Sequence, residues 1–75
     1  MNLGEILKQW LNDKSYPAIY EGNGVVTVRI VIGELNHLLR EIAEFSAGYL
    51  VDLRISVIHY WTDRVLVKVK VKELE

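Results

Sequence analysis

Residues 51–72 read VDLRISVIHYWTDRVLVKVKVK, and this stretch decides the fold. From residue 65 to residue 71 every other position is a valine, and the positions between them carry leucine or lysine. Such alternation is typical of a β-strand with one buried and one exposed face. Residues 51–60 alternate in the same way, so the stretch predicts a β-hairpin whose valines face a core.

The register of this hairpin follows from the rule that paired residues face the same side of the sheet. A three-residue loop at 62–64 sets Arg54 opposite Lys72, whereas a loop two residues longer sets Arg54 opposite Lys70 and Asp52 opposite Lys72. Both registers place two cations opposite each other, which destabilises a sheet by about 0.2–1 kcal/mol. A carboxylate or phosphate of a partner would offset this repulsion.

The rest of the chain predicts two helices and a second hairpin. Apolar residues recur at helical spacing in residues 2–13 and again in residues 35–48. Between them, residues 18–20 and 25–32 read as strands joined by the turn sequence EGNG at 21–24. Neither helix can bury its apolar stripe alone, so both are expected to cover one face of the sheet.

We therefore predict an α+β protein in the order α-β-β-α-β-β. The expected architecture is a two-layer α/β sandwich, a four-stranded, mostly antiparallel sheet with two helices on one face. Strand order stays open at this point. The second helix either joins neighbouring strands in parallel or carries the chain to an edge of the sheet.

Length and composition limit the classes of protein that remain. The 75 residues predict one small domain over 1–73, and Leu74-Glu75 is compatible with a vector-derived tail. The chain has no cysteine, which excludes disulfides and thiol chemistry, and its net charge of −1 gives no global attraction to nucleic acid or anionic lipid. No signal peptide and no long apolar run are visible, so we expect a cytoplasmic protein without a membrane partner.

The sheet face away from the helices is the predicted partner surface. Either plausible turn in the first hairpin sends Ile19 inward and Tyr20 outward, onto a face that mixes cations with apolar side chains. Such a mixture is typical of an interaction surface. The alternative is a solvated face on which lysines prevent edge-to-edge aggregation. The predicted contact residues are Tyr20, Arg29, Arg54, Ile58, Tyr60, Leu66, Lys68 and Lys70.

The other notable side chains have ordinary explanations. Trp61 shares the parity of the inward valines and is interpreted as closing the end of the core. His37 and Glu41 lie four residues apart on a helix, but two ligands do not make a metal site, and we do not expect His59 to complete one. No nucleophile and base occur in a catalytic motif. We expect no catalytic residue, no metal and no cofactor.

The sequence thus favours a non-enzymatic interaction module. It would self-associate, for example as a homodimer, or hold a protein partner through its open sheet face or an edge strand. The alternative is a nucleic-acid-binding domain in which Tyr20 and Tyr60 stack on bases while the cations contact phosphates. The slightly acidic balance of the whole chain counts against that alternative.

Overall fold

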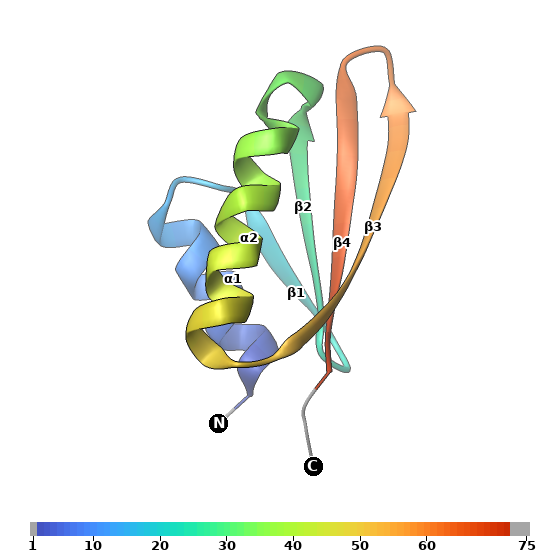
Figure 1. The fold of residues 1–75 in the computed structure, drawn as a ribbon. Coiled ribbons are helices and arrows are strands. Elements are labelled where there is room, and N and C mark those ends of the chain that lie inside the picture. Colours follow the sequence, from blue (N-terminus) through green and yellow to red (C-terminus); the bar gives the residue numbers. More distant parts are fainter. Residues whose placement is uncertain (1, 73–75) are drawn as a thin grey trace.

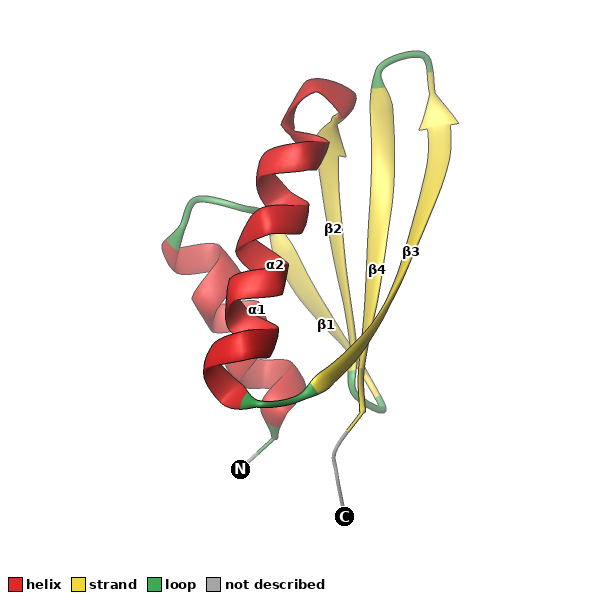
Figure 2. Ribbon diagram, in the orientation of Figure 1, coloured by secondary structure: helices red, strands yellow, loops and turns green. Residues whose placement is uncertain are grey.

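The computed structural model describes residues 2–72, so the predicted tail at 74–75 lies outside the described residues. Figure 1 shows both helices on one side of the sheet, and Figure 2 colours the two layers separately. The predicted α+β order and the antiparallel four-stranded sheet are confirmed. The elements are α1 (Leu3–Asp13), β1 (Ala18–Gly22), β2 (Val25–Val31), the short 3₁₀ helix η1 (Ile32–Glu34), α2 (Leu35–Tyr49), β3 (Asp52–Trp61) and β4 (Arg64–Lys72).

Helix α1 begins with a side-chain cap. The Oδ1 atom of Asn2 accepts a hydrogen bond from the backbone N–H of Gly4 at 2.8 Å, which satisfies one of the free amide groups of the first turn. The helix then buries Leu7 and Leu11 completely, one turn apart on the same face. The amphipathic helix predicted over 2–13 is therefore present, and it packs on the inner side of the sheet.

Helix α2 buries Leu38, Ile42 and Phe45, which lie on one stripe at helical spacing. It ends at Leu50, whose left-handed backbone (φ 54°) reverses the chain direction. The hydroxyl of Ser46 donates to the carbonyl oxygen of residue 51 at 2.6 Å and holds this exit in place. The second predicted helix is thus confirmed, and its end delivers the chain to β3.

The sheet has the strand order β1-β2-β4-β3, and all three pairings are antiparallel. Of the two connections left open by the sequence, the structure has the one in which the second helix carries the chain to an edge. Strands β2 and β3 consequently run parallel to each other, with β4 inserted between them. Strands β1 and β3 form the two edges of the sheet, as Figure 1 shows.

The second hairpin adopts the register expected for the longer of the two loops. Arg54 pairs with Lys70, and Asp52 pairs with Lys72. The strands close through a tight turn at Thr62 and Asp63, with an irregularity between His59 and Trp61 that absorbs the extra residue. The predicted juxtaposition of two cations across β3 and β4 is confirmed.

The first hairpin corrects one prediction. Tyr20 pairs with Val26 and therefore faces the helices, whereas Ile19 pairs with Thr27 and faces outward. The cause is a bulge at Glu21, where the register shifts by one residue between Tyr20 and the turn. A one-residue shift moves every side chain upstream of it to the opposite face. The predicted outward orientation of Tyr20 is wrong for this reason.

The helices cover β1, β2 and β4 better than β3. Val65, Val67 and Val69 of β4 are at most 2% exposed, whereas Ile55 and Val57, on the same side of β3, are 39% and 44% exposed. Trp61 at the end of β3 is 70% exposed, so its interpretation as part of the core is wrong. The register shift between His59 and Trp61 pairs Trp61 with Arg64, which has the parity of the outward-facing residues of β4, so the parity of Trp61 in the sequence does not bury it.

The turn of the first hairpin requires glycine at position 24, and this requirement can be tested. Gly24 has φ 77°, and an added Cβ would lie 3.0 Å from the carbonyl oxygen of Val71. We expect Gly24→Ala to lower the free energy of unfolding by about 1–2 kcal/mol. Gly48→Ala is the matched control, because its Cβ meets no atom within 4 Å; in helix α2 it should raise stability by about 0.5–1 kcal/mol. Urea unfolding followed by circular dichroism measures both, and equal midpoints would contradict the prediction.

Candidate interaction surfaces

The outer face of the sheet, opposite the helices, collects most of the predicted contact residues. Across the strands, Arg29 lies level with Leu66 and Ile58, and Lys70 lies level with Arg54. Lys68 lies between the row of paired residues that holds Leu66 and the row that holds Lys70. Exposed Tyr60 lies at the irregularity near the hairpin tip. Tyr20 is the predicted contact residue that the structure does not place on this face.

The cations of this face lack acidic partners. Among residues 2–72, the ion pairs within 4.0 Å join Lys14 to Glu41, His37 to Glu41, and Arg64 to Asp63. None of them involves the cations that face outward on the middle rows of the sheet, at positions 29, 54, 68 and 70. Lys70 instead donates from Nζ to the backbone carbonyl of residue 23. The positive charge on the outer face is therefore not neutralised within the described chain.

Two adjoining hollows indent the outer face. The first, which we call the basic hollow, has a volume of about 340 Å³ and is lined by Val25, Arg54, Ser56, Lys68 and Lys70. The second, which we call the turn hollow, has a volume of about 390 Å³ and is lined by Glu21, Gly22, Asn23, Val25, Thr27, Ile58, Leu66 and Lys68. Val25 and Lys68 line both hollows, so the two form one continuous depression.

The free edge of β3 is a second candidate surface. It is ten residues long and carries exposed apolar side chains on both faces. Ile55 and Val57 lie on the helix side, and Ile58 is 48% exposed on the outer side. An edge strand also presents unpaired backbone N–H and C=O groups, which can pair with a strand of another chain.

The two edges of the sheet differ in how they are protected. Edge strand β1 has only five residues, follows Pro17 directly and carries the bulge at Glu21. Short length, proline and bulges are the usual means by which edge strands avoid pairing with other chains. Between the ends of β3, by contrast, the only full charge is Arg54, and the ladder stays regular until the hairpin tip. The β3 edge therefore lacks the protection that β1 has.

Sequence reasoning identified the outer face but missed the helix side of β3. Ile55, Val57 and Trp61 share the parity of the buried valines, so their pattern predicts a core position. The strand order, which places β3 at an edge, shows that Ile55 and Val57 are accessible, and the register shift before Trp61 removes it from the core side. The available signal is the scarcity of charge in residues 53–61, which is unusual for an edge strand.

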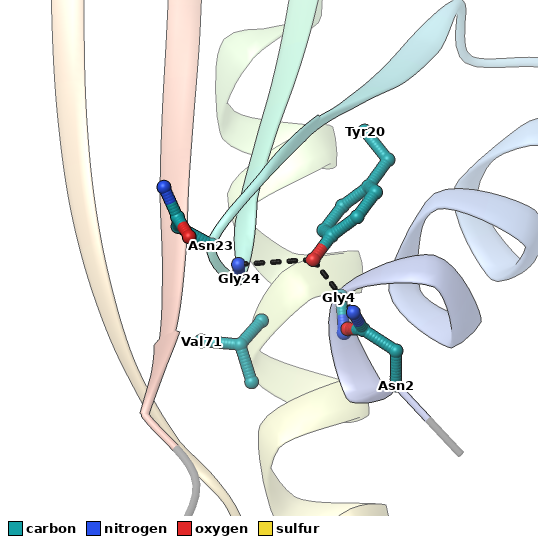
Figure 3. Close-up of a pocket in the computed structure, with 6 residues that line it drawn as sticks. All are labelled: Asn2, Gly4, Tyr20, Asn23, Gly24 and Val71. Carbon is teal, nitrogen blue, oxygen red and sulfur yellow. Dashed lines mark hydrogen bonds between the residues drawn. The ribbon is translucent and has the colours of Figure 1, made fainter.

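A third hollow, about 540 Å³, lies at the start of α1 and is shown in Figure 3. The hydroxyl oxygen of Tyr20 accepts hydrogen bonds from the side chain of Asn2 at 2.6 Å and from the backbone of Gly24 at 3.1 Å. These bonds tie helix α1 to the first hairpin. Tyr20 is thus a structural residue that joins two elements, and no nucleophile with an adjacent base lines this hollow.

The His37–Glu41 pair also has a structural explanation. The Nε2 atom of His37 lies 3.5 Å from Glu41, and the Nζ atom of Lys14 lies at the same distance from the other carboxylate oxygen. His59 instead approaches the carbonyl oxygen of residue 62 at 3.1 Å. Burial, together with the negative charges of Glu34 and Glu41, raises the pKa of nearby Tyr16. Among residues 2–72, no group of three potential ligands is placed to hold a metal ion.

Comparison with models of known protein families, with curated proteins and with solved structures finds no match to this chain. Within the part of the chain that the structure describes, neither helix combines the length and the apolar character needed to cross a membrane. The surfaces described above are therefore the basis for inferring a function.

The corrected position of Tyr20 can be tested. Tyr20→Phe removes the acceptor of two hydrogen bonds, and we expect it to lower the free energy of unfolding by about 1 kcal/mol. Tyr60→Phe is the control, because Tyr60 is 46% exposed and its hydroxyl has no hydrogen bond within residues 2–72. Its stability should change by less than about 0.5 kcal/mol. Urea denaturation compares the two, and an unchanged stability of Tyr20→Phe would contradict the inward position of Tyr20.

Proposed function

We propose that this protein is a non-enzymatic interaction module that self-associates through the free edge of β3. The observation that carries the proposal is the contrast between the two edges: β1 is short and interrupted, while β3 is long, regular and poor in charge. Pairing of two β3 edges would satisfy backbone groups that one chain leaves to water. It would also continue the sheet from one copy into the next.

The charges of β3 favour a second copy in antiparallel orientation. When the strands pair about a two-fold axis at Val57, Arg54 of each copy lies opposite Tyr60 of the other and not opposite another cation. The two Arg54 side chains are then six rows apart, about 20 Å at the rise of a β-strand. This separation exceeds the screening length of about 8 Å at physiological salt. Parallel in-register pairing would instead set Arg54 against Arg54.

The apolar side chains of β3 favour the same arrangement. A two-fold axis perpendicular to the sheet keeps the helix sides of both copies together, so Val57 meets its equivalent in the other chain and Ile55 lies diagonally next to it. Their exposed fractions, 39% and 44%, leave substantial apolar surface to be buried by such pairing. The assembly also closes, because each outer edge is then a protected β1 strand.

A charge placed within the proposed interface tests it. Val57→Lys puts an ammonium group on the helix side of the edge strand, where we expect it to prevent pairing. Ile19→Lys is the matched control, since Ile19 is 48% exposed and also lies on an edge strand, β1. Sedimentation velocity from micromolar to millimolar concentration should show a dimer for the wild type and Ile19→Lys, and a monomer for Val57→Lys.

Circular dichroism is the control for folding. We expect both variants to remain folded, because both positions are partly exposed. A wild-type protein that stays monomeric at millimolar concentration would overturn self-association. Equal effects of the two lysines would show that the contact does not use β3. Loss of dimer only in Ile19→Lys would assign the interface to β1 instead.

A further inference from the structure

The outer face carries a second proposal that does not depend on self-association. We propose that the basic hollow binds the phosphoryl group of a phosphate monoester, while the adjoining turn hollow holds the apolar part of the same ligand. The two hollows form one depression through the side chains that they share, Val25 and Lys68. Their linings differ in chemistry, and this difference identifies the class of ligand.

The basic hollow concentrates positive charge and hydrogen-bond donors. Arg54 and Lys70 are direct cross-strand neighbours, and Lys68 pairs with Ser56 in the next row. Cross-strand neighbours have Cβ atoms about 4.5–5.5 Å apart, so one anion of phosphate size can approach these side chains together. The guanidinium of Arg54 offers a planar pair of donors, and the lysines and Ser56 add further donors.

The absence of acidic partners strengthens this assignment. No carboxylate among residues 2–72 lies within 4.0 Å of Arg54, Lys68 or Lys70. The repulsion between Arg54 and Lys70 is inherent in the register, because both are paired on the outer face while their sequence neighbours point to the helix side. A dianion between them replaces repulsion by attraction, whereas a single carboxylate would supply half that charge.

The turn hollow distinguishes a phosphate monoester from a nucleic-acid strand. Ile58, Leu66 and Val25 contribute apolar side chains, which suit an aromatic or aliphatic group. Glu21 also lines this hollow, and its carboxylate accepts a hydrogen bond from Thr27 at 2.8 Å. A polyanionic backbone crossing both hollows would meet this carboxylate, whereas a ligand with one charged end and one neutral end would not.

Phenyl phosphate and inorganic phosphate are the probes for this site. In a nuclear magnetic resonance titration at constant ionic strength, and at a pH where the phosphoryl group is a dianion, both should cause saturable shifts of the amides at positions 54, 56, 68 and 70. Phenyl phosphate should bind more tightly, because its ring contacts the turn hollow. Shifts that fail to saturate, or that spread equally over cations of the helices, would overturn the proposal.

Variants separate the two parts of the site. Arg54→Gln should weaken binding of both probes about tenfold, whereas the control Arg40→Gln removes an exposed cation of α2 and should change neither. Ile58→Ser, at a 48% exposed position, should weaken phenyl phosphate and leave inorganic phosphate unchanged. Equal losses from Arg54→Gln and Arg40→Gln would reduce the effect to general charge attraction and overturn the site.

Two further arms test the choice of ligand and the independence of the site. A single-stranded oligonucleotide that binds in a salt-sensitive manner, while phenyl phosphate does not, would overturn the monoester site in favour of a nucleic-acid surface. At a concentration where the wild type is monomeric, the Val57→Lys variant should bind phenyl phosphate as the wild type does, because Val57 lies on the other face of the sheet. A failure of self-association would therefore not contradict the phosphate site, and a failure of phosphate binding would not contradict self-association.

Discussion

Strand β4 determines the positions of the other elements. It lies between β2 and β3 and pairs with both over nearly its whole length. Its inward side chains Val65, Val67 and Val69 are at most 2% exposed, and burial of each contributes about 1.5–3 kcal/mol. A slip of one residue would expose all of these valines and bury lysines in their place. The register of β4 against both neighbours is therefore strongly determined.

The same constraint creates the basic outer face. Because the valines must point to the helices, Lys68 and Lys70 must lie on the opposite face of the sheet. They lie in the middle of that face and not at an edge, since β4 pairs on both sides. Arg54 joins them because the register of β3 is set by the same ladder. The cross-strand pair of like charges is thus a consequence of how the core forms. An anion at this position would compensate for a repulsion that the fold itself imposes.

The sequence predicts the regular parts of this fold because their signals are local and repeated. The helices and the alternation in β4 follow from periodicity, and equal facing limits the hairpin to two registers, of which the structure has the one that pairs Arg54 with Lys70. The orientation of Tyr20 does not, because one extra residue at Glu21 reverses the parity of β1 without a composition that marks it.

Strand order is harder to obtain, since it depends on contacts between distant segments. The sequence could therefore identify the cations of the outer face but not the accessibility of Ile55 and Val57.

The exposure of β3 follows from the dimensions of its elements. At about 3.4 Å per residue the ten residues of β3 span about 34 Å, whereas the fifteen residues of α2 span about 22 Å at about 1.5 Å per residue. Two helices of this size cannot cover a sheet with strands this long, so the helix side of β3 remains accessible at Ile55 and Val57. Among residues 2–72 there is no third α-helix to cover this part of the sheet. A second copy joined at β3 would supply the missing strand neighbour together with additional apolar cover, which is why the unprotected edge and the incomplete helical layer point to the same surface.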